Sequence, residues 1–379
     1  MAHTLASDTR RRLLQGAAGA ALAGAAPWAA ALPRPADKRP AVYRTLHTFD
    51  HASPDAGGAS PMSPPVQMAD GLLWGTTNEG GELGFGTIYA MTPQGRIRTM
   101  HSFKGTKGGF GDYVSATPGH RLVQGPDGDL WGTVFGGGID QGNGSVGKGT
   151  LFRYRRGGRF STVHRFGEGS ATGTNPEAGL ILASDGHFYG TTGYGGVGGN
   201  GTVYRVAPDG EVTDMHVFRR GPGDGARIGT ELVQASDGGL WGVTPFGGTA
   251  DDGIVFRLGL DGSFAVVHHF AGGAQGDVPT SALVQGADGA LYGTCFASGR
   301  WGTGLLYRIT LDGVYTQLHS FSGEQPRVGK GPEGALVATS DGSIYGVTRI
   351  GSREGSGSIY RYSPSGGMQP VHAFAAHDQ

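Results

Sequence analysis

The residues best suited to acid–base chemistry in this sequence are Tyr113, His120 and Arg121. A tyrosine or histidine can remove a proton, and an arginine can neutralise a carboxylate on which negative charge develops. A lyase that removes the proton beside the carboxylate of a uronate sugar needs both groups. These three are therefore the candidate catalytic residues, and neither a metal nor another cofactor is required of them.

A second set of residues interrupts the repeats described below and carries aromatic or basic side chains. These candidate ligand-binding residues are His51, Lys148, Tyr194, Arg227, Phe246, Trp301, Lys330 and Arg349. Aromatic faces stack on flat ligands and arginines grip carboxylates, so the set suits an anionic or sugar-like ligand. For each residue the alternative is an ordinary loop side chain.

Other reaction classes find less support. A glycoside hydrolase needs two positioned carboxylates, and no pair stands out among the expected loop acids Glu82, Asp112, Asp140, Asp224 and Asp251. Asp251-Asp252 could hold calcium, but adjacent acids are more often solvated. Gly142–Lys148 resembles a phosphate-binding loop, but Gly149 and a strand follow it where a hydroxyl residue and a helix are needed. The single cysteine, Cys295, excludes an intramolecular disulfide and an all-cysteine metal site.

The elements that must position these residues follow from an internal repeat of about fifty residues. Its marker is an apolar residue, an aromatic and a glycine, preceded by Asp-Gly in all six copies. The copies are Leu73-Trp74-Gly75, Leu130-Trp131-Gly132, Phe188-Tyr189-Gly190, Leu240-Trp241-Gly242, Leu291-Tyr292-Gly293 and Ile344-Tyr345-Gly346. Asp-Gly between apolar runs predicts a tight hairpin, because both residues tolerate positive φ.

Each repeat supplies four short strands, which we name a to d. In the second copy they are Arg121–Val123 (a), Leu130–Gly132 (b), Gly149–Phe152 (c) and a strand ending His164-Arg165-Phe166 (d). Six such units predict an all-β, six-bladed β-propeller, with a β-helix or sandwich as the alternative. Strand d occurs a seventh time, so either 43–49 or 369–374 completes the last blade and closes the ring.

The turns distinguish two faces. The a–b and c–d connections are tight, whereas the b–c and d–a connections are long and irregular and should share the opposite face. Binding and catalysis concentrate on such loops, so we expect the site on this long-loop face. The seven d-strand histidines recur once per repeat, and this regularity favours a structural role through hydrogen bonds between blades.

The repeats resemble the GloVer tandem repeat of exported bacterial proteins, which reads approximately L-H-x-F, then L-V-x-x-x-D-G-x-L-Y-G-T-T, then G-T-V-F-x-I. The resemblance covers residues 43–374 in six copies that agree in order and spacing. It implies a propeller and an exported location. It implies no reaction, because the family has no shared catalytic motif to carry onto particular residues.

The first residues form an export signal of the twin-arginine type. Arg10, Arg11 and Arg12 precede an Ala- and Gly-rich stretch that ends at Ala29-Ala30-Ala31, a cleavage-site pattern. The stretch is short and weakly apolar for the alternative, a membrane anchor. We expect residues 1–31 to be removed, 32–42 to be a linker, 43–379 to be one domain, and the protein to be periplasmic or secreted.

The net charge and the apolar segments limit the kinds of partner that we expect. A formal net charge of -1 argues against a nucleic-acid-binding protein. No further apolar stretch predicts a membrane span in the mature chain, which we expect to be a monomer. Two hypotheses remain for the long-loop face: binding of a glycan or another extracellular ligand, which we favour, and a polysaccharide lyase. A structural protein without a small ligand is the third.

Overall fold

The computed structural model describes residues 44–49, 58–104, 121–137, 147–155, 157–167, 173–322, 328–351 and 356–374. The chain divides into two compact units, residues 1–36 and 37–379, and every described residue belongs to the second. No helix in these ranges is both long and apolar enough to cross a membrane.

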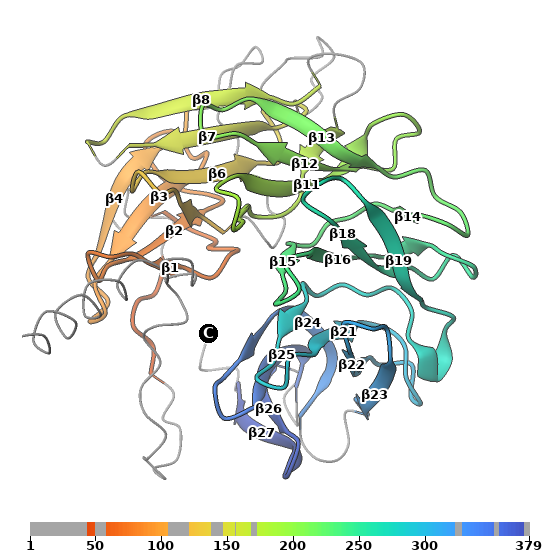
Figure 1. Cartoon of the computed structure of the whole chain (residues 1–379). Coiled ribbons are helices and arrows are strands. Elements are labelled where there is room, and N and C mark those ends of the chain that lie inside the picture. The colour runs from red at the N-terminus through yellow and green to blue at the C-terminus, as the bar shows by residue number, and fades with distance from the viewer. Residues whose placement is uncertain are drawn as a thin grey trace, which may run out of the picture. The chain divides into compact units, whose positions relative to one another are not determined.

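Six antiparallel four-stranded blades form the ring of a β-propeller, in the order that the repeats predict (Figure 1). The strands of blades 1 to 3 are β1 (Val66–Gln67), β2 (Leu73–Thr77), β3 (Thr87–Met91) and β4 (Ile97–Ser102); β5 (Val123–Gln124), β6 (Leu130–Val134), β7 (Thr150–Tyr154) and β8 (Phe160–Arg165); β10 (Ile181–Leu182), β11 (Phe188–Gly195), β12 (Thr202–Val206) and β13 (Val212–Val217). Strand β9 (Gly173–Pro176) adds to blade 3 by pairing with β11.

Blades 4 to 6 repeat this plan. Their strands are β15 (Val233–Gln234), β16 (Leu240–Thr244), β18 (Ile254–Leu258) and β19 (Phe264–His269); β20 (Val284–Gln285), β21 (Leu291–Cys295), β22 (Leu305–Ile309) and β23 (Tyr315–Ser320); β24 (Lys330–Ala338), β25 (Ile344–Ile350), β26 (Ser358–Ser363) and β27 (Gly367–Ala373). A separate two-stranded ladder joins β14 (Gly225–Ala226) to β17 (Phe246–Gly247), and one 3-10 turn covers Gly273–Gln275. The d strands lie at the outer edge of the ring in Figure 1.

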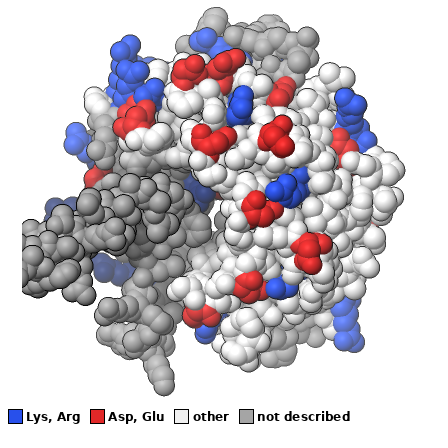
Figure 2. All heavy atoms as spheres, viewed as in Figure 1, with Lys and Arg blue, Asp and Glu red and all other residues white. Residues whose placement is uncertain are grey.

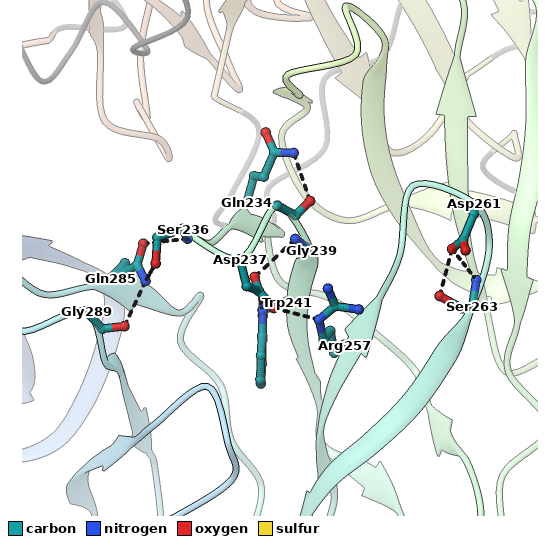
Figure 3. Close-up of polar contacts among 11 residues, drawn as sticks. Gln234, Ser236, Asp237, Gly239, Trp241, Arg257, Asp261, Ser263, Gln285 and Gly289 are labelled. Atoms are coloured by element: carbon teal, nitrogen blue, oxygen red, sulfur yellow. Dashed lines mark hydrogen bonds and ion pairs between the residues drawn. The ribbon is translucent and has the colours of Figure 1, made fainter.

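The aspartate of each a–b turn has a defined function. Its Oδ1 accepts the N–H of the residue two positions later in all six blades, at 2.9–3.2 Å, and only the following glycine has positive φ. Figure 3 shows the fourth blade, where Asp237 also accepts hydrogen bonds from Trp241 Nε1 at 3.2 Å and Arg257 Nε at 2.6 Å. The turn is therefore tied to both strands that follow it.

The apolar core lies between blades. Five clusters of buried residues each join two consecutive blades, from blades 1 and 2 to blades 5 and 6. In each, the d-strand phenylalanine meets an aromatic c-strand residue of the next blade: Phe321, for example, lies 5.1 Å from Tyr360 between ring centroids. Burial of such rings between sheets supplies the main favourable free energy.

Some of the d-strand histidines differ from the predicted hydrogen-bonding role, whereas His216 hydrogen-bonds to Asp224. Nε2 of His101, His268 and His319 is buried and has no hydrogen-bond partner among the described residues. His101 and His268 instead stack flat on Phe160 and Tyr315, which start the next d strand, at 4.2 and 4.4 Å between ring centroids. The histidines join blades, but in these cases by ring packing.

The question of the surplus strand is resolved for blade 6. Strand β27 carries His372 and pairs with β26, so the C-terminal copy completes the last blade. The N-terminal copy packs on blade 1 instead, with Phe49 5.3 Å from Tyr89 between ring centroids. Phe49 thereby makes the contact that the outer strand of a preceding blade makes elsewhere in the ring.

Candidate functional site

Five polar and aromatic side chains from blades 2 to 4 lie on the long-loop face, in two sets of contacts that meet at residues 229–231. We call this group, Arg121, Glu177, Tyr194, Arg227 and Glu231, the inner-rim cluster. Arg121 and Glu231 each stand two residues before an inner strand, β5 and β15, and Glu177 directly follows β9. Tyr194 lies near the end of β11, and Arg227 follows β14.

An ion pair links blades that are not neighbours. The Arg121 guanidinium lies 3.1 Å from Oε2 of Glu231, with 40% of the arginine side chain and 16% of the glutamate side chain exposed. Arg121 belongs to blade 2 and Glu231 to blade 4, so the pair passes blade 3 on its inner side. The corresponding position of blade 3 is Gly179, which has no side chain to obstruct it.

The carboxylate of Glu177 occupies space left by two glycines. A Cβ atom on Gly193 would lie 2.4 Å from Cδ of Glu177, and one on Gly229 would lie 2.7 Å from its Oε2. Neither glycine has positive φ, so the backbone does not require glycine at these two positions. Gly193 belongs to blade 3 and Gly229 to the loop entering blade 4, so the glycines make a cradle for one carboxylate between two blades.

Arg227 and Tyr194 form a platform beside this cradle. The guanidinium carbon of Arg227 lies 4.9 Å from the centre of the Tyr194 ring, and 38% of Tyr194 is exposed. Arg227 has a φ of 58°, and its backbone N–H donates to the carbonyl of Asn200 at 2.8 Å. Asn175 has the same φ at the matching point of blade 3, so this conformation belongs to the scaffold.

Burial is the largest influence on the pKa of the Glu177 and Glu231 carboxyl groups. It raises the pKa of Glu177, against the opposing charge of Arg227, and raises the pKa of Glu231, against the opposing charge of Arg121. Carboxylates accept hydrogen bonds from hydroxyl groups, guanidinium groups donate them, and an exposed aromatic ring offers a flat apolar surface. The cluster can therefore bind a ring that carries several hydroxyl groups.

The structure places two of the residues that the sequence singled out, Tyr194 and Arg227, in contact with each other, and a third, Arg121, in the ion pair with Glu231. Arg121, Tyr194 and Arg227 all belong to the inner-rim cluster, although the guanidinium of Arg121 forms an ion pair with Glu231. Tyr113, His120 and His51 lie outside the described residues, so the arrangement of the predicted catalytic set stays a prediction.

Two other predicted residues, Lys148 and Phe246, contact residues outside the cluster. The aliphatic part of Lys148 lies against Gly167, and its carbonyl accepts the N–H of Asn175 at 2.6 Å. Phe246 lies beneath the guanidinium of Arg220, 5.6 Å from the ring centre, and Arg220 forms an ion pair with Asp251. Asp251-Asp252 was considered above as a calcium site, but the carboxylate of Asp251 forms an ion pair with Arg220.

Trp301 belongs to a loop of blade 5, and Lys330 and Arg349 belong to strands β24 and β25 of blade 6. Trp301 is 54% exposed and lies beside Arg300, whose guanidinium carbon is 4.8 Å from its ring centre. The N–H of Gly331, next to Lys330, donates to the carbonyl of Thr303 at 2.8 Å and so joins the two loops.

Sequence reasoning missed both carboxylates of the inner-rim cluster. The signal was present for Glu231, which breaks the repeat at the same position as Arg121, where the other copies carry Pro64, Gly179, Ala282 and Ala335. For Glu177 the signal lies in Gly193 and Gly229, and only the fold brings these glycines beside it.

One expected loop acid has a histidine partner at the outer edge. Asp224 Oδ1 lies 3.0 Å from Nε2 of His216, and Asp224 also accepts the N–H of Arg219 at 2.9 Å. These residues line a hollow of about 330 Å³. His216 stacks on Phe264 with 3.7 Å between ring centroids, so the pair also belongs to the packing of blades 3 and 4. Within the described ranges, no three His, Cys, Asp or Glu residues group in a way that could hold a metal ion.

Known proteins resemble the chain in sequence and in fold. The sequence pattern of one family, described as the Gloeobacter/Verrucomicrobia repeat, matches residues 109–300 and 223–379. No curated protein matches the sequence. Among solved structures, the periplasmic gluconolactonase of Pseudomonas aeruginosa has a TM-score of 0.51 and 19% identity, over 80% of this chain and 82% of that one. A provisionally assigned 6-phosphogluconolactonase of Bacteroides uniformis has a TM-score of 0.50 and 16% identity, over the same shares. At these identities the likeness concerns the fold alone.

Proposed function

The chain belongs to the Gloeobacter/Verrucomicrobia repeat family, and on that footing we propose that it is an exported β-propeller that binds a glycan on its long-loop face. The observation that carries this proposal is the inner-rim cluster. Its two carboxylates, two guanidinium groups and exposed tyrosine ring supply acceptors, donors and a stacking surface in one place.

The charges of the cluster favour a hydroxyl-rich, uncharged sugar. Arg121 is paired with Glu231, and Arg227 carries the charge nearest to Glu177. Arg121 is therefore not free to neutralise a carboxylate of the ligand without giving up its own, and the charge of Arg227 acts on Glu177 without an ion pair between them. Sugar hydroxyls can instead donate to the glutamates and accept from the arginines, without separating the charges.

The same pairing weakens the lyase hypothesis. A lyase needs Arg121 to neutralise a uronate carboxylate, and Arg121 is already neutralised by Glu231. The other members of that hypothesis, Tyr113 and His120, lie outside the described residues. No feature of the described residues favours turnover, so glycan binding by a monomer is the function we propose.

Export rests on the N-terminal sequence, with Arg10, Arg11 and Arg12 before an Ala-rich stretch. Location in the periplasm or outside the cell is therefore part of the proposal. Replacement of the three arginines by lysine should retain the protein in the cytoplasm, and fractionation of expressing cells tests this. Unchanged export of the lysine variant would contradict a twin-arginine signal.

Binding to a glycan array, followed by calorimetric titration with the best neutral oligosaccharide, tests the site. Gly229→Ala should weaken binding about tenfold or more, because its Cβ would meet Oε2 of Glu177 and displace the carboxylate. Tyr194→Ala should weaken it severalfold by removing the exposed ring.

The matched control is Gly223→Ala. Gly223 also has an ordinary φ, and a Cβ there would meet nothing within 4 Å. The Gly223→Ala variant should therefore bind like the wild type. Equal affinity of the Gly229→Ala and Gly223→Ala variants would remove the inner-rim cluster from the proposal, and an array without any bound glycan would contradict glycan binding itself.

A further inference from the structure

Four b–c loops on the long-loop face are built alike. They connect the b and c strands of blades 1, 3, 4 and 5, and they are residues 78–86, 193–201, 245–253 and 296–304. In each loop the N–H of the last residue donates to a carbonyl on the other arm, at 2.8–3.2 Å. The b–c loops of blades 2 and 6 lie partly outside the described residues.

The end of each of these loops is a tight turn that projects from the blade. In blades 1, 3 and 5 a glycine with positive φ closes the turn and donates its N–H to the glycine three residues earlier, at 3.1–3.4 Å; these closing residues are Gly84, Gly199 and Gly302. Asp251 has the same conformation in blade 4, with a φ of 64°. A Cβ atom on Gly84 or Gly199 would meet nothing within 4 Å, so open space surrounds these turns.

Apolar side chains occupy the centres of the four turns. Central turn residues are most often Gly, Pro, Asn, Asp or Ser, but each of these turns has one apolar central residue. We call these residues the apolar tips: Leu83, Val197, Ala250 and Trp301. Leu83 is 52% exposed, Val197 72% and Trp301 54%. Single exposed apolar residues are common on proteins, but packing within the domain does not account for a repeated one at a projecting turn.

The turns of the opposite face differ. In all six a–b turns the second central residue is the aspartate that accepts the turn hydrogen bond. Two c–d turns have a central leucine, Leu260 and Leu311, and both are half-buried against apolar clusters between blades. No large apolar side chain at the centre of a described a–b or c–d turn is exposed. The projecting apolar turns therefore belong to the long-loop face.

From this arrangement we propose that the long-loop face docks on the surface of a lipid bilayer, with the apolar tips inserted among the lipid headgroups and the first carbons of the acyl chains. Leucine and valine side chains gain free energy when they leave water for an apolar medium. A tryptophan ring suits the boundary between headgroups and acyl chains, because its indole is apolar and carries one N–H donor.

The chemistry and spacing of the tips favour lipid over other surfaces. Leu83, Val197 and Ala250 have no flat ring to stack on a sugar, so only Trp301 suits a polysaccharide surface. The tips also belong to four separate blades. A fluid bilayer accepts separate insertions, whereas a stable protein partner needs a complementary surface of about 800 Å².

Charge does not distinguish the tips. Glu82 precedes Leu83 and Arg300 precedes Trp301, so the two charged neighbours balance. The long side chain of Arg300 can keep its charge among the headgroups while the indole beside it inserts. Figure 2 shows acidic and basic side chains interspersed over the face that it draws, without a broad area of one sign. Apolar burial should therefore supply most of the binding, with little contribution from anionic lipid.

Flotation with vesicles of phosphatidylcholine, with and without phosphatidylglycerol, tests the proposal. We expect the full chain to float with both kinds of vesicle, with little change as ionic strength rises to about 0.15 M, where the screening length is about 8 Å. The triple variant Leu83→Ser/Val197→Ser/Trp301→Ser should bind at least about tenfold more weakly. The matched control is Val314→Ser, which removes a 58% exposed valine beside a c–d turn of the opposite face and should leave binding unchanged.

Tryptophan fluorescence can report insertion directly. Trp301 is the most exposed tryptophan of the described residues, since Trp74 is half-buried and Trp131 and Trp241 are buried. Phosphatidylcholine with brominated acyl chains should therefore quench the fluorescence through Trp301. Trp301→Phe should lose most of the quenching and still float with vesicles. The measurement uses the chain without residues 1–31, which carry the fifth tryptophan.

Two further comparisons separate the tips from other causes of binding. Residues 1–31 include an apolar stretch, so the chain from Leu32 onward, which keeps the whole second compact unit, should float like the full chain. Gly229→Ala should float like the wild type, so failure of the inner-rim cluster would not be mistaken for failure of the tips. The inner-rim cluster shares this face, so a glycan bound there would lie at the membrane surface.

Three results would overturn the proposal. The first is a chain from Leu32 onward that does not float with either kind of vesicle. The second is a triple variant that floats like the wild type. The third is tighter binding to insoluble cellulose than to vesicles with the same dependence on the triple variant, which would assign the apolar tips to a polysaccharide surface.

Discussion

The most specific residue-scale feature of this propeller is the fit between one glutamate and two glycines. The carboxylate of Glu177 fills the space that side chains at Gly193 and Gly229 would otherwise need. Burial of this group costs free energy, since the charged form loses hydration. A buried carboxylate with a raised pKa is typical of a ligand site, where a polar group can bind a partner.

This cost predicts a pH-dependent stability. Burial raises the pKa of Glu177 above 4.5, its ordinary value, so the folded chain holds this proton more tightly than the unfolded chain. Its contribution therefore falls as the pH rises from the ordinary to the raised pKa. We expect Glu177→Gln to melt a few degrees above the wild type at pH 7, with the gain vanishing near pH 4, roughly the ordinary carboxyl pKa. Thermal denaturation followed by circular dichroism at both pH values measures this.

The control for the pH experiment is Glu211→Gln, in the exposed c–d turn of blade 3. Its melting temperature should follow that of the wild type at both pH values. A Glu177→Gln variant that melts below the wild type at pH 7 would show that attraction to Arg227 outweighs burial.

At the scale of the element, the a–b turn is the unit that organises a blade. The Asp-Gly pair was predicted to form a tight turn, and it does so in all six blades. The prediction rested on the tolerance of both residues for positive φ, and only the glycine has it. The aspartate instead accepts hydrogen bonds, and in blade 4 those from Gly239, Trp241 and Arg257 hold its pKa below the ordinary value although burial opposes ionisation.

Asp237→Ala should therefore destabilise the fold by about 2 kcal/mol, because three donors lose one acceptor. Asp70→Ala in blade 1 is the matched control, because it removes a turn aspartate without an arginine partner. Asp70 accepts the Leu72 N–H at 2.9 Å, but Ala90 stands at the strand position that Arg257 occupies in blade 4. We expect a loss of about 0.5–1 kcal/mol there. Urea denaturation at pH 7 compares the two, and equal losses would show that only the turn hydrogen bond matters.

Elements were more predictable than the contacts between them. Repeat spacing and Asp-Gly turns revealed blades and faces, because both depend on neighbours in the sequence. The stacking of His101 on Phe160 depends on a residue of the next blade, and the d-strand histidines alone suggested hydrogen bonds. The cradle of Glu177 likewise depends on glycines from two blades. What could not be predicted was therefore contact between segments that only the fold brings together.

At the scale of the whole molecule, stability is a chain of interfaces between neighbouring blades. Five consecutive pairs of blades share buried apolar clusters, and the described residues supply none between blades 6 and 1. On blade 6, Val347 is 41% exposed, whereas Val243, at the same position of blade 4, is fully buried. Among the described residues, the first and last blades thus have less apolar contact than the other four.

The N-terminal segment offsets part of this deficit, and a pair of variants can measure how much. Phe49 meets Tyr89 at 5.3 Å and 61°, nearly the geometry of Phe321 on Tyr360, at 5.1 Å and 59°. Phe321 is fully buried, whereas Phe49 is partly exposed at the edge of the repeat array.

In a structure made of successive interfaces, loss of an internal contact disrupts two flanking blades, while loss of a terminal one affects a single blade. We therefore expect Phe321→Ala to cost about 3–5 kcal/mol and Phe49→Ala about 1–2 kcal/mol in urea denaturation. If Phe49→Ala cost as much as Phe321→Ala, residues 44–49 would be a full structural member of the ring, and its integrity would depend on the segment just after the expected linker.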